Sequence, residues 1–474
     1  MKIDNINIKE TLESAKKMLE KEEHISAALR VVLNILLAFM QVMLEQFSLT
    51  SKNSSKPPSQ DPNRTKKNKE SASGKRKPGG QPGRLGKQLK PVSNPDKIEH
   101  LLIDKRTLPQ GTYREAGFEA RQVVDFSISL KVTEYRAQVL LDEKNRRYVA
   151  EFPAFVTRPI QYGSHIKATS VYMSQYQLMP YNRIEDYFSQ QIGLEISTGS
   201  LFNFNKEAYE LLEKFEGITK EKLITSAIVN ADETGINVNG KRIWLHTACN
   251  EKWTHFYPHH KRGSEAMDEI GILPAFKGVL CHDYWKAYLK YNCLHSLCNA
   301  HHLRELEWSA AEDNQKWAAV MKKFLLALND KVNVAGGKLS EQQCAYYHKK
   351  YKKIIDLAHQ RCSLPNEKRA PGKRGRIKKS KSRNLLERLA RHEDDVLRFM
   401  HDIHVPFTNN QGENDLRMTK VQQKISGCFR SEEGALIFCR IRAYLITCRK
   451  HGLDPTSALQ LLYEGKLPQF ILNS

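Results

Sequence analysis

Three carboxylates in separate parts of the chain could together carry out metal-dependent chemistry. Asp232 lies in "AIVNADETGINV", Asp283 lies near the end of "FKGVLCHDYW", and Glu413 lies in "FTNNQGENDLR". Carboxylate oxygens are hard ligands of the kind that Mg²⁺ or Mn²⁺ prefers. Two such ions about 3.5–4 Å apart can activate an attacking oxygen and stabilise the leaving oxygen at a phosphodiester. Spacing alone does not single these residues out, because the chain has 53 acidic residues and most such groups are simply solvated.

The section around the two aspartates predicts a sheet. "AIVNADETGINV" is typical of a strand, and Asn239-Gly240 predicts a two-residue hairpin turn. "KRIWLHTA" and "WTHFYPH" alternate as two more strands, and "SEAMDEIGIL" predicts a helix capped by Ser264. "FKGVLCHDYW" predicts a buried strand ending at Asp283, and a fifth strand is expected before "CNAHHLREL". This order is that of an RNase H-like sheet, in which the two aspartates meet on adjacent strands while Glu233 points to the other face.

The remaining chain predicts segments of different character, and its length suggests about three domains. The predicted segments are an N-terminal helix or coiled coil (1–48), a disordered basic linker (49–95), a small β-rich module (96–158), a helical region that could hold a helix-turn-helix (159–222), the first part of the core (223–310), a helical insertion with a basic tract (311–404), and the glutamate helix with a C-terminal element (405–474).

The N-terminal segment has the apolar spacing of a coiled coil. Residues 10–48 predict one long helix with a shared apolar face made by Leu29, Val32, Leu36, Phe39 and Met43. Such a helix packs either on its own domain or on a second protomer. We favour protomer pairing, because the following segment is too poor in apolar residues to fold. The apolar run Val31–Leu44 within this segment is too short and too polar to span a membrane. The charged N-terminus is unlike a signal peptide.

Two segments between the linker and the sheet predict further modules. Phe126, Ile128, Leu130 and Val132 alternate on one face, and "DEKNRRY" turns the chain back, which predicts the β-rich module. "RIEDYFSQQIGLEISTGSLFNFNKEAYELL" predicts two helices separated by a turn at Gly193, the second capped near Ser197 or Thr198. This pair is either a DNA-reading helix-turn-helix or, more commonly, a helical hairpin in a core.

The charge balance predicts a polyanionic partner. The chain has 75 basic and 53 acidic residues, a net charge of +22 and a pI near 9.4, which favours nucleic acid. The linker stretch "GKRKPGGQPGRLGK" would lie along phosphates or in a minor groove, although a solvated linker is the alternative. The tract Glu367–Arg383 is equally basic, and Arg417, one turn after Glu413, would contact phosphate or pair with that glutamate. The DNA-binding candidates are Lys75, Arg76, Lys77, Arg84, Lys373, Arg374, Arg376 and Arg417.

The cysteines favour a reducing compartment rather than a disulfide framework. All nine lie at or after Cys249 with no regular spacing, which predicts a cytoplasmic protein. Cys298 and His301 form a Cys-x2-His pair after the expected fifth strand. Further cysteines and histidines lie nearby in sequence, namely Cys281, His282, Cys293 and His302. The spacing is not a common zinc pattern, so we interpret the pair as structural or substrate-positioning and zinc as an unlikely cofactor.

The order of the motifs resembles a known family. "NADETG", "CHDYWKAY", "CNAHHLREL" and "NNQGENDLR", with "NSSKPPSQD" and "KRKPGGQPG" in the linker, resemble the successive motifs of the insertion sequence 66 family of bacterial DDE transposases. The resemblance continues to "GALIFCRIRAYLITCRKHGLDPTSALQLL" and so covers nearly the whole chain. Each motif is loose, but their order is specific. One departure is that relatives often carry a cysteine-based zinc module after the linker, whereas this chain has no cysteine before Cys249.

The resemblance implies a function and a site. It implies an α/β, RNase H-like core with a mixed five-stranded sheet, in which Asp232, Asp283 and Glu413 are catalytic and hold two Mg²⁺ or Mn²⁺ ions. It implies binding to the terminal inverted repeats of an element, strand cleavage and strand transfer. Expected partners are element and target DNA, other copies of the chain in at least a dimer, and small accessory proteins. The alternatives are an RNase H-like nuclease or junction resolvase, and a DNA-binding protein whose catalytic site has decayed.

Overall fold

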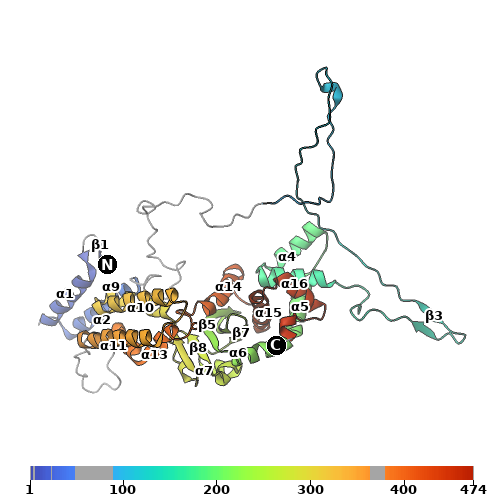
Figure 1. Cartoon of the computed structure of the whole chain (residues 1–474). Coiled ribbons are helices and arrows are strands. Elements are labelled where there is room, and N and C mark those ends of the chain that lie inside the picture. Colours follow the sequence, from blue (N-terminus) through green and yellow to red (C-terminus); the bar gives the residue numbers. More distant parts are fainter. Residues whose placement is uncertain (1, 4–5, 23, 48–88, 363–378, 473–474) are drawn as a thin grey trace. The chain divides into compact units, whose positions relative to one another are not determined.

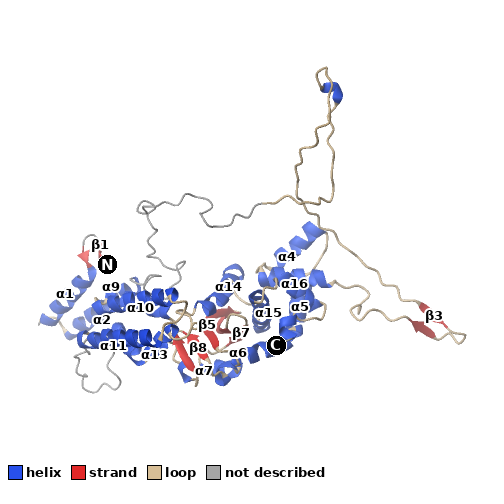
Figure 2. Cartoon of the chain, viewed as in Figure 1, coloured by secondary structure: helices blue, strands red, loops and turns tan. Residues whose placement is uncertain are grey.

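The computed structural model of the chain describes residues 2–3, 6–22, 24–47, 89–362 and 379–472. Its contacts divide the chain into two compact units, one formed by residues 1–64 and 150–474 and the other by residues 65–149. Helices and one five-stranded sheet make up most of the first unit (Figures 1 and 2). Seven of the predicted DNA-binding residues lie outside the described residues, namely Lys75, Arg76, Lys77, Arg84, Lys373, Arg374 and Arg376. None of the described helices is long and apolar enough to cross a membrane.

The secondary structure is mainly helical outside that sheet. The strands are β1 (Lys2–Ile3), β2 (Ile6–Asn7), β3 (Val139–Leu141), β4 (Arg147–Val149), β5 (Ile228–Val238), β6 (Lys241–Cys249), β7 (Thr254–His259), β8 (Val279–His282) and β9 (Leu294–Leu297). The α-helices are α1 (Ile8–Lys21), α2 (Ala27–Phe47), α3 (Ser164–Val171), α4 (Tyr181–Tyr187), α5 (Thr198–Leu211), α6 (Glu213–Ile224), α7 (Ser264–Ile270), α8 (Ile272–Ala275), α9 (Asn299–Glu312), α10 (Lys316–Val334), α11 (Glu341–Arg361), α12 (Lys381–Arg391), α13 (Glu393–Leu397), α14 (Asn410–Ser426), α15 (Glu432–Lys450), α16 (Pro455–Tyr463) and α17 (Gln469–Leu472). Shorter turns are the 3₁₀ segments η2 (Lys105–Thr107), η5 (Tyr288–Lys290) and η6 (Arg398–Met400), and the π-helical segments η3 (Tyr172–Tyr176) and η4 (Phe188–Ile192).

The five-stranded sheet confirms the predicted strands and their order. Its strand order is β7-β6-β5-β8-β9, with β5, β6 and β7 antiparallel and with β8 parallel to both β5 and β9. Asn239 and Gly240 have φ of 48° and 79°, the left-handed values that a type I′ hairpin between β5 and β6 requires. One prediction was wrong in detail. The residue before α7 is Gly263, so Ser264 begins this helix rather than capping it.

Strand β8 lies between two hydrophobic clusters, and its successive residues face one cluster or the other. Leu280 faces the larger cluster, which contains β5, α5 and α15. Val279 and Cys281 face the other way, into a cluster built with the helices between α9 and α13. This is the period-two alternation of a strand covered on both faces. The described residues of the predicted insertion are mainly helical, in α10 to α13, and these helices pack on the face of β8 that carries Val279 and Cys281.

The N-terminal segment is two helices rather than the single long helix that we predicted. The first helix ends at Lys21 and α2 begins at Ala27, where the Ser26 hydroxyl caps it by accepting a hydrogen bond from the Leu29 amide at 3.2 Å. The apolar face of α2 is exposed, including Leu29, Val32, Leu36, Phe39 and Met43. Pairing of protomers through this face stays a prediction, which the sedimentation velocity of the full chain would test.

The predicted β-rich module is smaller than expected. Residues 89–158, all of them described, hold the hairpin β3–β4 but no strand at Phe126–Val132, where Phe126 is 82% exposed. A two-stranded hairpin buries too little apolar surface to organise further strands. The predicted turn is confirmed, since Asn145 has φ of 56° and the Asp142 carboxylate accepts amide hydrogen bonds within the turn.

The helical pair at residues 181–211 has the predicted turn and cap. Gly193 has φ of 70°, and the Ser197 hydroxyl accepts the Ser200 amide at 3.1 Å. The first helix continues as the π-helical segment η4. Leu201, Phe204 and Ala208 of α5 are buried in the main cluster, which is the packing of a core hairpin. A DNA-reading role for this pair stays a prediction.

The buried His246 on β6 makes stability depend on pH. Burial lowers its pKa from 6.5 to about 4, while one ring nitrogen contacts the Lys261 carbonyl at 3.1 Å. The imidazole is therefore neutral in the folded chain, but it takes up a proton below pH 6.5 once the chain unfolds. The free energy of unfolding should fall by up to about 3 kcal/mol from this residue as the pH decreases from 6.5 towards 4.

Urea unfolding at several pH values would measure this effect. In His246→Gln the amide can still donate to the Lys261 carbonyl but does not titrate, so its free energy of unfolding should change less steeply with pH than that of the wild type. Equal slopes for the two proteins would contradict the assignment.

Candidate active site

Strands β5 and β8 bring two of the three predicted carboxylates together. In their parallel register Asn230 pairs with Cys281. Asp232 and Asp283 each follow two residues later, so they lie at the same level and on the same face of the sheet. Asp283 comes directly after the end of β8, and its Oδ1 accepts the Trp285 amide at 2.9 Å.

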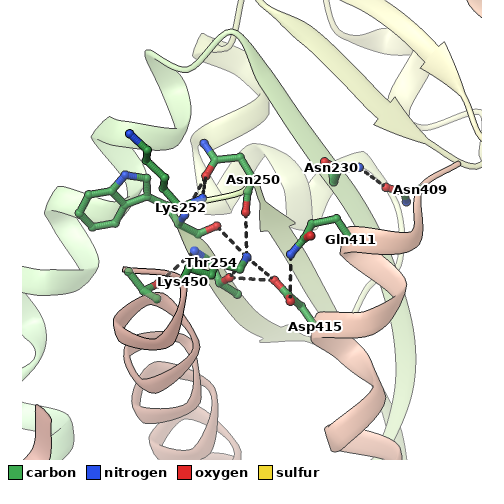
Figure 3. Close-up of polar contacts among 10 residues, drawn as sticks. Asn230, Asn250, Lys252, Thr254, Asn409, Gln411, Asp415 and Lys450 are labelled. Carbon is green, nitrogen blue, oxygen red and sulfur yellow. Dashed lines mark hydrogen bonds and ion pairs between the residues drawn. The ribbon is translucent and has the colours of Figure 1, made fainter. Parts of the chain in front are cut away.

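The third carboxylate arrives on α14, whose first residues are anchored to β5. The Asn409 side chain donates to the Ala231 carbonyl at 2.8 Å and accepts from the Asn230 side chain at 2.8 Å (Figure 3). Gly412 lies so close to β5 that a Cβ there would be 3.4 Å from the Cβ of Asp232. Glu413 is the next residue, and its negative charge is close enough to act on Asp232.

Electrostatic interactions link Asp232 to the other two carboxylates. Burial raises the pKa of Asp232 well above its usual range, and the negative charges of Glu233, Asp283 and Glu413 raise it further. Carboxylates held together in a buried place repel one another unless a cation compensates them. Their oxygens are the donors that Mg²⁺ or Mn²⁺ takes, and Glu413 Oε1 is buried without a hydrogen-bond partner among the described residues. The residues present therefore fit a divalent cation.

Glu233 faces a different set of partners, as the strand alternation predicts. Its carboxylate accepts the Arg262 guanidinium at 2.8 Å and a short hydrogen bond from the Tyr288 hydroxyl. Arg262 also lies over the rings of Trp285 and Trp244, at 4.0 and 4.8 Å from their centroids. These contacts occupy Glu233 and separate its role from that of Asp232. Nothing in the spacing of Arg262 or Tyr288 identified them as its partners.

A buried ion pair fixes α14 from its other side, and sequence reasoning missed it. Lys450 at the end of α15 lies 2.7 Å from the Asp415 carboxylate, which also accepts the Thr254 hydroxyl of β7 at 2.8 Å (Figure 3). Lys450 donates further to the Asn250 carbonyl at 2.8 Å, and Gln411 donates to Asp415 at 3.3 Å. Asp415 is two residues from Glu413, so the network sets the rotation of the helix that carries Glu413.

The Cys298–His301 pair lies at the same place. Donor atoms of Cys298, His301 and Glu413 lie within 4.8 Å of one another. Burial lowers the pKa of His301 to about 4, helped by the positive charge of Arg304, so its imidazole is neutral. The other four cysteines and histidines that the sequence placed nearby do not belong to this group. Nothing in the spacing of Cys298 and His301 indicated that the pair would meet Glu413.

Arg417 is exposed on α14, one turn after Glu413. Both residues are described, and the structure forms no ion pair between them, so the predicted alternative of a helix salt bridge is not realised. The Arg417 side chain is exposed to solvent.

Comparison with known proteins identifies the family. A model of the transposase IS66 family matches residues 159–436, more than half of the chain and all three carboxylates. The chain belongs to the IS66 transposase family. Residues 5–90 match a family of unknown function, DUF6444. Among curated proteins, the uncharacterized protein y4jO of Sinorhizobium fredii is 36% identical over 70 residues, which are 15% of this chain and 22% of that protein. The chain thus matches only about a fifth of the length of this relative.

Removal of Lys450 from this IS66 family member should be strongly destabilising. In Lys450→Met the Asp415 carboxylate stays buried without its cation, and breaking a buried pair in this way costs about 3 kcal/mol or more. Lys466→Met is the matched control, because the Lys466–Glu464 pair is largely exposed and should contribute less than about 1 kcal/mol. Urea unfolding of both variants measures the difference, and similar losses would contradict a positioning role for the buried pair.

Proposed function

We propose that this IS66 family member is a DDE transposase that binds the terminal inverted repeats of an insertion sequence, cleaves a strand at each end and joins it to target DNA. The single observation that carries the proposal is the meeting of Asp232, Asp283 and Glu413 on β5, after β8 and on α14. The order of these residues along the chain and the family membership agree with it.

The connectivity of the sheet supports an RNase H-like core. Three antiparallel strands, a helical crossover and two parallel strands give the order β7-β6-β5-β8-β9. In this arrangement β5 lies at the centre of the sheet and β8 is its neighbour. Asp232 on β5 is therefore close to Asp283, which directly follows β8. The glutamate helix packs back on the central strand after the long insertion. The fold alone does not define the chemistry, which depends on the carboxylates.

The three carboxylates would hold two divalent cations, Mg²⁺ or Mn²⁺, which supply charge neutralisation at the phosphodiester when bound. The chain itself holds the carboxylates in position. Asn409 ties the start of α14 to β5, and the Asp415–Lys450 pair holds its rotation. Water attacks the phosphorus in the first step and the 3′-hydroxyl leaves. That hydroxyl then attacks a target phosphorus, and a target 3′-oxygen leaves with a proton.

The charge of the chain supports DNA as the substrate. The excess of 22 positive charges would raise the affinity for a polyanion, and Arg417 is exposed one turn after Glu413 on α14. The basic tracts at 75–84 and 367–383, and other copies of the chain, would contribute to the complex with element ends. Binding should therefore weaken steeply as the salt concentration rises.

The test is an assay with labelled element ends, a target plasmid and Mg²⁺. The wild-type protein should yield joined products. Asp232→Asn, Asp283→Asn and Glu413→Gln should each lower cleavage by at least about a hundredfold, because each removes one charged ligand, while end binding stays nearly intact. Asp356→Asn, which changes an exposed carboxylate on α11, is the matched control and should cleave like the wild type.

Each outcome separates this proposal from its rivals. Cleavage without joining would mean a nuclease or junction resolvase. Binding with neither cleavage nor joining would mean a decayed catalytic site. Near-normal cleavage by any one of the three carboxylate variants would remove that residue from the site.

A further inference from the structure

Glu413 belongs to a second group of donor atoms, of different chemistry from the aspartates. Its carboxylate, the Cys298 sulfur and a His301 ring nitrogen lie within 4.8 Å of one another. Cys298 precedes the first turn of α9 and His301 lies within that turn, while Glu413 lies in the first turn of α14. The two helix starts therefore face each other across this group.

Backbone hydrogen bonds hold the two helix starts in this position. The Cys298 amide donates to the His282 carbonyl at 2.9 Å, and the Asn299 amide donates to the Phe407 carbonyl at 3.1 Å. The Asn409 amide donates to the Cys298 sulfur at 3.2 Å. Burial raises the pKa of the Cys298 thiol, and the Asn409 amide partly offsets this rise because it stabilises negative charge on the sulfur. The geometry is thus set by the fold and not by the side chains alone.

Two polar atoms of the group are buried without any hydrogen-bond partner. These are Glu413 Oε1 and His301 Nδ1, and both residues belong to the described part of the chain. A buried acceptor or donor normally finds a partner, because leaving it unpaired is costly. The same two residues each contribute a donor atom to the group that lies within 4.8 Å of the Cys298 sulfur. A cation bound by this group would give Glu413 and His301 a partner that the described residues do not supply.

We propose that Cys298, His301 and Glu413 bind a borderline-soft divalent cation of the zinc type. Sulfur, nitrogen and oxygen donors together suit Zn²⁺ or Co²⁺, whereas Mg²⁺ takes an all-oxygen shell. On binding, the Cys298 thiol releases its proton to solvent and the sulfur electron pair forms the bond to the metal. Three protein ligands leave a fourth position open, as in zinc sites that accept water or substrate.

The proposal goes beyond transposition, because it gives Glu413 two alternative sets of partners. A cation held by Cys298 and His301 would draw the Glu413 carboxylate towards α9 and away from Asp232 and Asp283. Zinc-type ions would then compete with the proposed hard ions for one shared residue. The short Cys-x2-His spacing did not indicate this site, because the third ligand lies on a distant helix.

The test uses Co²⁺ with the full-length protein and no DNA. A cobalt–thiolate bond gives a charge-transfer absorption that all-oxygen sites do not give. The wild type should show this band, saturating at about one Co²⁺ per chain, and Zn²⁺ should displace it. Cys298→Ser should lose the band, and His301→Gln should weaken Co²⁺ binding by at least about tenfold.

The controls separate this site from the rest of the molecule. Cys281→Ser removes a buried thiol on β8 that is not part of the group, so its band should persist. Asp232→Asn should also retain the band, even though the proposed DNA cleavage would fail in it. Unfolding midpoints show whether Cys298→Ser is still folded. A wild type without the band, or a band that survives in folded Cys298→Ser, would overturn the proposal.

Discussion

The contact between the start of α14 and strand β5 is the constraint on which the site depends. Glu413 is far from the aspartates in sequence and must be returned to them after the whole helical insertion. The Asn409 side chain does this by bonding to Asn230 and to the Ala231 carbonyl, the residues just before Asp232. Gly412 permits the close approach, because a Cβ there would lie only 3.3 Å from the Asn409 side chain and 3.4 Å from the Cβ of Asp232. The motif "NNQGEN" is therefore the segment through which the start of α14 packs against β5, the central strand of the sheet.

The same contact brings negative charges close together, and a bound cation would offset their repulsion. Burial raises the pKa of Asp232, and the negative charges of Asp283 and Glu413 raise it further. Two other carboxylates near the site are neutralised by ion pairs within the chain. Glu233 is paired with Arg262, and Asp415 is paired with Lys450. The three proposed catalytic carboxylates have no such paired lysine or arginine among the described residues. This contrast distinguishes structural carboxylates from those that would hold metal ions.

Much of the sheet and the positions of the carboxylates could be predicted from the sequence, because they depend on local rules. Strand alternation, the Asn239-Gly240 turn and the end of β8 at Asp283 are all visible in short windows. Long-range contacts were not visible. The Asp415–Lys450 pair and the meeting of Cys298 with Glu413 depend on how α9, α14 and α15 pack. The single N-terminal helix and the strand at Phe126–Val132 were wrong because apolar periodicity does not reveal a cap at Ser26 or the lack of a partner strand.

The central claim is that Asp232, Asp283 and Glu413 together form one divalent cation site. Fe²⁺ in place of Mg²⁺, with ascorbate and peroxide, cuts a polypeptide next to where the ion binds, and mass spectrometry locates the cuts. We expect cuts close to all three residues, and we expect excess Mg²⁺ to suppress them together. Cuts near Cys298 that resist Mg²⁺ would report the second group instead. Cuts confined to other acidic stretches, or a residue of the three that is never cut nearby, would contradict the account.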